Sequence, residues 1–201
     1  MNPIVLITGG SRGIGAATAL LAAQHGYGVA VNYTANSLAA DEVVRQIRAG
    51  GGTAITVQAD VAVEAQVMAM FEKIDAKLGP LSALVNNAGV VDVALRVDAM
   101  DVARLKRMST RHGGVGGTIV NVSSVAASKG AIDTFTVGLS REVATEGIRV
   151  NAVRPGIIET DIHASGGQPD RARQMAQAIL WLLGGDSSYT TGAVIDVAGG
   201  R

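Results

Sequence analysis

Short apolar runs alternate with longer amphipathic stretches along the whole chain. The first run, from Ile4 to Ile7, contains no polar position, as expected for a strand that is buried on both faces. The same kind of run predicts strands at 4–7, 29–31, 54–58, 84–85, 119–122, 150–153 and 194–197. Helical patterns between these runs predict helices at 16–24, 37–49, 63–78, 129–146 and 171–183.

This alternation predicts an α/β fold, a Rossmann-type doubly wound parallel sheet, because each strand is followed by a crossover helix. A length of 201 residues is typical of one domain, and we expect residues 1–201 to form a single dinucleotide-binding domain. Two details are expected within it. Ala131, Phe135, Leu139 and Val143 recur every four residues and predict one apolar helix face, and Trp181 lies in an apolar run that predicts a core position.

Composition narrows the functional classes. Lys and Arg together number 17, as do Asp and Glu, so the net charge of zero gives no electrostatic reason to expect nucleic acid or an anionic membrane as partner. The chain has no cysteine, which excludes a thiol nucleophile, and its three histidines are too scattered in sequence to predict a metal site. The sequence shows no signal-peptide pattern and no apolar run of membrane-spanning length, so we expect a cytoplasmic protein.

A glycine-rich turn joins the first predicted strand to the first predicted helix. It reads Thr8-Gly9-Gly10-Ser11-Arg12-Gly13-Ile14-Gly15. Glycines in this position let the backbone approach a pyrophosphate, and the helix N-terminus that follows offers unpaired N–H groups to it. An ordinary tight turn is the alternative, but the strand before and the helix after are the context that a dinucleotide site requires.

The spacing of Gly9, Gly13 and Gly15 resembles that of the short-chain dehydrogenase/reductase family. The resemblance continues along the chain, at the ends of the later strands. It is carried by Asn86-Asn87-Ala88-Gly89, Asn121-Val122-Ser123-Ser124, Arg154-Pro155-Gly156 with Thr160, and Tyr189-Thr190-Thr191-Gly192. Members of the 3-oxoacyl-carrier-protein reductase and glucose 1-dehydrogenase types are the most similar in pattern.

The resemblance implies a nicotinamide dinucleotide as cofactor. The residues it implies at that site are Gly9, Ser11, Arg12, Gly13, Ile14, Gly15, Asn32, Tyr33, Asp60, Val61, Asn87, Ala88, Gly89, Lys129, Pro155, Gly156 and Thr160. The second strand ends in Asn32-Tyr33-Thr34, without the carboxylate that favours NAD, and Arg12 could pair with a 2′-phosphate. We therefore expect NADP(H) in preference to NAD(H). Arg12 could instead be a solvated loop residue, and Asp60 could be the N-cap of the next helix.

The family resemblance further implies hydride transfer between the nicotinamide and a carbonyl or alcohol substrate. It assigns Ser124 to the substrate oxygen and Lys129 to the nicotinamide ribose and to lowering the pKa of a catalytic tyrosine. That tyrosine is expected four residues before Lys129, where this chain has Val125. The tyrosines that the chain does contain, Tyr27, Tyr33 and Tyr189, lie in other motifs and do not fit the role.

The chain is also shorter than the family pattern near 108/109, 125–128 and 165–175. In one interpretation the protein lacks these segments and is a catalytically inactive dinucleotide-binding paralogue. In the other, the natural protein contains the segments and is an active reductase on a small-molecule substrate. We favour the second, because deleting half of a buried helix would expose apolar sheet at a large cost. A purely structural role would leave Arg12 and the glycine turn unexplained. The resemblance implies a homotetramer or homodimer, with contacts through helix 131–143 and the last strand.

Overall fold

The computed structural model describes residues 2–88, 107–124, 130–156 and 169–199, and within these ranges seven strands form one sheet. All of its neighbouring pairs are parallel, and their order is β3-β2-β1-β4-β5-β6-β7. The strands are β1 (Ile4–Ile7), β2 (Gly28–Tyr33), β3 (Ala54–Gln58), β4 (Ala83–Asn86), β5 (Gly117–Val122), β6 (Ile148–Pro155) and β7 (Val194–Val197).

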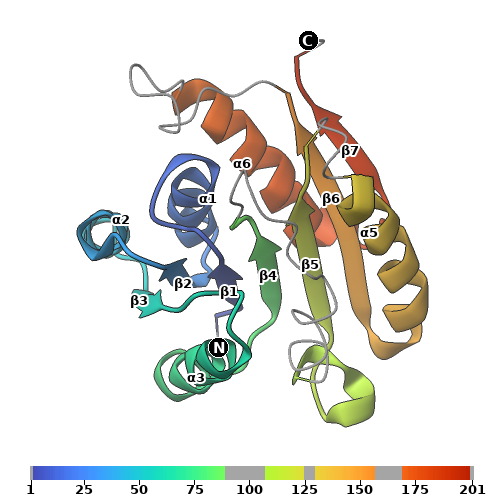
Figure 1. Ribbon diagram of the computed structural model, residues 1–201, viewed down its shortest axis with the longest axis horizontal. Helices are drawn as coiled ribbons and strands as arrows, with labels where there is room; N and C mark the ends of the chain where they lie inside the picture. Colours follow the sequence, from blue (N-terminus) through green and yellow to red (C-terminus); the bar gives the residue numbers. More distant parts are fainter. Residues whose placement is uncertain (1, 89–106, 125–129, 157–168, 200–201) are drawn as a thin grey trace.

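Helices cover both faces of the sheet. The α-helices are α1 (Gly13–Gln24), α2 (Ser37–Ala49), α3 (Glu64–Lys77), α5 (Gly130–Val143) and α6 (Pro169–Leu183), and short 3-10 turns occupy Thr110–His112, Ala144–Glu146 and Gly185–Ser187. Figure 1 shows α1, α2 and α6 on one face and α3 and α5 on the other. The predicted doubly wound α/β fold is therefore confirmed.

The central strand explains why the apolar runs have no polar face. In β1, Val5 and Ile7 pack in the core beneath α1, α2 and α6, whereas Ile4 and Leu6 pack in the core beneath α3 and α5. Successive strand residues point to opposite faces, so a strand covered on both faces must be apolar at every position.

Two residues expected to be buried are not. Of the expected apolar face of α5, Phe135, Leu139 and Val143 do pack in the core beneath α3 and α5. Ala131 is exposed, and the buried residues of α5 are Thr136, Leu139, Ser140 and Val143. Four residues advance an α-helix by about 400°, so a strict four-residue series drifts about 40° per step and leaves the buried face. Trp181 is 44% exposed. The stripe of Met175, Ile179 and Leu182 packs inward, and Trp181 lies about 200° around α6 from Ile179.

The expected break near 108/109 falls in a turn that the structure describes. Met108 and Ser109 are both fully buried. The backbone N–H of Gly116 donates to the Met108 carbonyl at 2.8 Å, and that of Gly114 donates to the Ser109 carbonyl at 2.9 Å. The chain thus makes a closed turn into β5. The break expected at 125–128 lies outside the described residues. Of the one expected at 165–175, residues 165–168 also lie outside them, whereas 169–175 form the first part of α6. All three breaks stay predictions.

The parallel sheet brings the C-terminal ends of its strands to one edge. There the chain leaves β1 at Thr8, β4 at Asn87, β5 at Ser123 and β6 at Gly156. Strand order reverses at β1, which lies between β2 and β4, and crevices at such switch points are where doubly wound sheets bind ligands. The predicted site residues in the described ranges lie at or next to this edge.

Candidate functional site

Glycines of the turn after β1 stand where a side chain would be strained or would collide. Gly9 and Gly13 have positive φ angles of 61° and 54°, which favour glycine. A Cβ at Gly15 would lie 2.4 Å from the Gly9 carbonyl oxygen and 2.6 Å from Nδ2 of Asn87. The turn is therefore built from bare backbone packed on backbone, as the approach of a bulky anion requires.

Helix α1 begins inside this turn and presents its N-terminus at the edge. Arg12 is the N-cap residue but makes no capping bond with its side chain, and the first turn contains no acidic residue. The first N–H groups of a helix have no intrahelical acceptors, and they carry a partial positive charge. This arrangement fits a pyrophosphate, so the residues present suit the dinucleotide that the sequence predicts.

Thr8 and Asn87 tie the glycine turn to the end of β4. Nδ2 of Asn87 donates to the carbonyl oxygens of Thr8 at 2.9 Å and Gly9 at 3.1 Å. The Thr8 hydroxyl oxygen accepts from the backbone N–H groups of Asn87 at 3.0 Å and Ala88 at 2.9 Å. Thr8 was missed as a site residue, and its place directly before Gly9 was its only signal in the sequence.

Asn32 holds the same turn from the other side. Its side chain is 1% exposed, and Oδ1 accepts the backbone N–H of Gly9 at 3.3 Å. Nδ2 donates to the carbonyl oxygens of Val57 at 3.2 Å and Ala59 at 3.0 Å. The carboxamide is thus fully engaged inside the protein. It shapes the cofactor turn, and the outward-facing positions at the end of β2 are Tyr33 and Thr34.

The substitution Asn32→Asp is expected to destabilise the protein by about 3 kcal/mol or more, because it places a buried carboxylate against two carbonyl oxygens and removes their donors. Asn36→Asp is the matched control. Asn36 is the exposed N-cap of α2, where Asp caps equally well, so we expect a change of about 0.5 kcal/mol or less. Urea unfolding of the two variants checks this, and equal stabilities would contradict the assigned role of Asn32.

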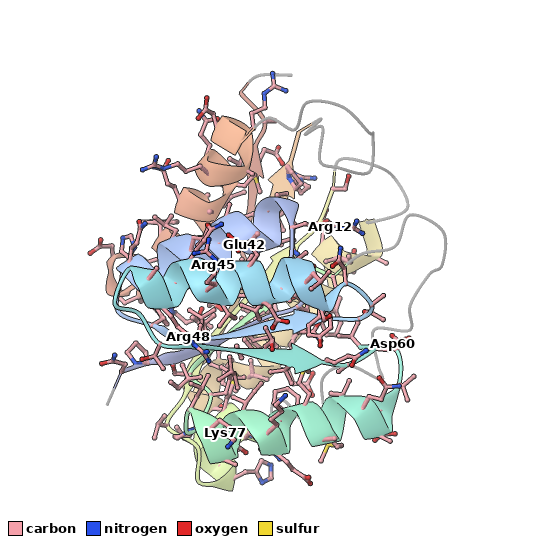
Figure 2. The ribbon with its side chains drawn as sticks, turned by 90° about the vertical axis from the view of Figure 1, so that its left-hand side faces the viewer. Arg12, Glu42, Arg45, Arg48, Asp60 and Lys77 are labelled. Atoms are coloured by element: carbon pink, nitrogen blue, oxygen red, sulfur yellow. The ribbon has the colours of Figure 1, made fainter. Side chains whose placement is uncertain are left out.

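The side of the edge formed by β1, β2 and β3 contains Arg12, Asp60 and Val61, which the sequence predicts to contact the adenosine. Figure 2 shows Asp60 just beyond the end of β3 and Arg12 above it, on the same side of the view. Arg12 is exposed and forms no ion pair with any acidic residue in the described ranges. Oδ1 of Asp60 accepts the backbone N–H of Ala62 at 2.9 Å. The alternative that Asp60 caps α3 is wrong, because that helix begins at Glu64 with Val63 as its N-cap.

The opposite side of the edge contains the ends of β5 and β6. Ser123 is buried and donates its backbone N–H to the Val153 carbonyl at 2.9 Å, which places Ser124 at the partly exposed end of β5. The backbone N–H of Gly156 donates to the Val197 carbonyl at 3.3 Å and fixes the turn after Pro155. The remaining predicted residues, Gly89, Lys129 and Thr160, lie outside the described residues.

The structure places all three tyrosines, and none reaches Ser124. Tyr27 and Tyr189 line hollows that also contain Gly117, the first residue of β5, whereas Ser124 follows its last residue. The six-residue strand separates them by roughly 20 Å. Tyr33 ends β2, three strands from β5, which is roughly 14 Å away.

The electrostatic environment of Tyr27 also argues against a catalytic role. Burial raises the pKa of the Tyr27 phenol, and the positive charge of Arg149 offsets this only in part. A catalytic phenol needs a pKa lowered toward neutrality, so the shift has the wrong direction. The sequence-based conclusion that none of the three tyrosines fits the catalytic position agrees with this geometry.

Strand order, the bare glycine turn and the helix N-terminus define a dinucleotide-binding α/β protein. The family model described as short chain dehydrogenase matches residues 3–170. The chain belongs to the short-chain dehydrogenase/reductase family, which consists of oxidoreductases that use a nicotinamide dinucleotide. The structure describes no helix long and apolar enough to cross a membrane.

Relatives of known sequence and structure match over nearly the whole chain. The chain is 49% identical to the uncharacterized oxidoreductase YgfF of Escherichia coli strain K12, over 98% of this chain and 99% of that protein. It is 32% identical to the 3-oxoacyl-[acyl-carrier-protein] reductase FabG of Staphylococcus aureus, over 100% and 98%. The structure of acetoin dehydrogenase from Enterobacter cloacae is similar with a TM-score of 0.84 and 29% identity, over 100% of this chain and 95% of that one.

The alignments are longer than the chain itself. The alignment with YgfF spans 245 positions, whereas the chain has 201 residues. Since 98% of this chain is aligned, several tens of positions of that relative have no counterpart inside this chain.

Proposed function

We propose that the protein is an NADP(H)-dependent oxidoreductase that interconverts a carbonyl and an alcohol group of a small molecule. The observation that carries this is the bare glycine turn at the N-terminus of α1, where a Cβ on Gly15 would collide with the Gly9 carbonyl. When bound, the dinucleotide supplies or accepts the hydride. The chain's own residues hold its pyrophosphate at Gly9–Gly15, its adenosine beside Asp60 and its nicotinamide beside Pro155 and Gly156.

The preference for NADP(H) over NAD(H) is supported by charge at the end of β2. Tyr33 is the last residue of β2 and Thr34 follows it. Helix α2 begins at Ser37, and its first turn contains no acidic residue. The end of β2 and the first turn of α2 therefore hold no carboxylate that could repel a 2′-phosphate. Arg12 has its guanidinium exposed at the same edge and can donate two parallel hydrogen bonds to a phosphate.

The chemistry requires a proton donor in addition to Ser124. Ser124 lies at the end of β5, where its hydroxyl can hydrogen-bond the substrate oxygen. We propose that the natural enzyme carries the segments that these 201 residues lack, with a tyrosine four residues before Lys129. The length of the alignment with YgfF supports this. We further propose a cytoplasmic homotetramer or homodimer.

Two measurements on the protein purified from its natural source test this proposal together. We expect its intact mass to exceed the 20.4 kDa of the present chain by the mass of several tens of residues. We also expect it to oxidise NADPH when a carbonyl compound from a panel of candidates is present. A mass of 20.4 kDa with NADPH binding but no oxidation would overturn the proposal. It would leave the alternative of a catalytically inactive dinucleotide-binding paralogue.

A further inference from the structure

A hydrogen-bonded chain of polar side chains, the Asn86–Asn121–Thr136 chain, links the sheet to α5. Nδ2 of Asn86 on β4 donates to Oδ1 of Asn121 on β5 at 2.8 Å. Nδ2 of Asn121 donates to the hydroxyl oxygen of Thr136 on α5 at 2.9 Å, and that hydroxyl donates to the Ile132 carbonyl at 2.7 Å. Asn121 is 4% exposed and Thr136 is fully buried.

The surroundings of this chain are apolar. Leu139 and Val143 continue the inner face of α5 and pack against Ile119 and Val150 of the sheet. Buried hydrogen bonds add little net stability compared with apolar groups of the same shape, but an unmatched partner is costly. The bond from Asn121 to Thr136 joins β5 to α5 and is lost if α5 shifts along the sheet, so it favours the observed placement of α5.

In sequence, the elements at both ends of this hydrogen-bonded chain adjoin residues of the proposed cofactor site. Asn86 directly precedes Asn87, which holds the glycine turn through Thr8 and Gly9. At the other end, Lys129 immediately precedes the first residue of α5 in the sequence. Figure 1 shows α5 beside β6.

A charged contact supports the same placement of α5. Arg154, next to Pro155 at the end of β6, lies 3.6 Å from Asp133 in the first turn of α5. Its Nε also donates to Asp196 of β7 at 2.6 Å. The N-terminal part of α5 is thus held to β5 by Thr136 and to β6 by Asp133.

We propose that Asn121 and Thr136 are positioning residues that fix α5 against the edge of the sheet and thereby set the nicotinamide half of the cofactor site. This rests on the proposed function, in which Ser124 and Lys129 serve that half. The adenosine half lies at Arg12, which follows β1 at the N-terminus of α1, whereas Asn121 and Thr136 lie on β5 and α5. Breaking the chain should therefore weaken one half of the site and spare the other.

The test uses two probes, NADPH and adenosine 2′,5′-bisphosphate, which carries the adenosine half alone. Thr136→Val keeps the shape of the side chain and removes the hydroxyl. We expect it to raise the Kd for NADPH about fivefold, as for loss of one buried hydrogen bond, and to leave the Kd for the bisphosphate unchanged. Thr136→Ser restores the hydroxyl and is expected to restore NADPH affinity.

Thr134→Val is the matched control. Thr134 lies on the exposed side of α5, and its hydroxyl donates only within the helix, to Gly130 at 3.2 Å. We expect no change for either probe. Asn121→Leu breaks the same Asn86–Asn121–Thr136 chain at its residue on β5. We expect it also to raise the Kd for NADPH and to leave the Kd for the bisphosphate unchanged. This second variant keeps the test decisive if Thr136→Val does not fold.

The outcomes separate this inference from the function on which it rests. If the wild type binds the bisphosphate and NADPH but Thr136→Val and Asn121→Leu change neither Kd, or change both equally, the positioning role is overturned while the proposed function stands. If the wild type binds neither probe, the proposed function fails and the positioning role fails with it.

Discussion

Gly15→Ala abolishes measurable NADPH binding and destabilises the protein by about 1–3 kcal/mol, the range typical of overpacking. The added methyl group would lie 2.4 Å from the Gly9 carbonyl oxygen and 2.6 Å from Nδ2 of Asn87. Both contacts are with groups that shape the turn, since Asn87 is bonded to Thr8 and Gly9. The turn must open to admit the methyl group, and the pyrophosphate then loses its backbone cradle.

The control for this variant is Gly138→Ala, which is also a glycine-to-alanine change inside an α-helix. A Cβ at Gly138 meets nothing within 4 Å. Alanine favours a helix over glycine, so we expect Gly138→Ala to stabilise the protein by about 0.5–1 kcal/mol and to leave NADPH binding unchanged. Thermal unfolding and fluorescence titration with NADPH check both variants. Retention of wild-type affinity in Gly15→Ala would refute the assignment of the turn.

Arg12→Ala raises the Kd for NADPH about 10–100-fold and changes the Kd for NADH little. The guanidinium is exposed at the adenosine side and forms no ion pair among the described residues, so it is available for the 2′-phosphate. A hydrogen bond to a charged group contributes about 1.5–3 kcal/mol, which corresponds to this range of affinity. NADH lacks the phosphate and loses nothing.

Arg45→Ala removes the same charge elsewhere on the same face of the molecule. Arg45 lies on the exposed side of α2, where it pairs with Glu42 at 2.7 Å (Figure 2). We expect no change in either Kd for this variant. Equal losses of NADPH and NADH affinity in Arg12→Ala would show that the arginine supports the turn and does not read the 2′-phosphate.

The backbone framework of the site could be predicted from local sequence. Predicted and observed bounds agree for β1, β3, α2 and β7, because buried strands and capped helices leave apolar patterns of fixed period. The glycine turn was recognisable because Gly9 and Gly13 stand where only glycine adopts the required backbone angles easily.

Side-chain direction could not be predicted in the same way. Both faces of β2 are covered, so the sequence does not tell whether Asn32 points to the ribose or into the protein, and its bonds to Gly9, Val57 and Ala59 depend on the neighbouring strand β3. The sequence likewise does not predict that Thr136 lies on the buried face of α5, because its partner Asn121 lies on a separate element.

We propose that this protein binds NADP(H) at the edge formed by the glycine turn and Arg12. Fluorescence titration of the wild-type protein with NADPH and with NADH tests it most directly. We predict saturable binding of both, with NADPH tighter by about tenfold or more, as one charge-assisted phosphate contact provides. No binding of either dinucleotide would contradict the account, and tighter binding of NADH would contradict the role of Arg12.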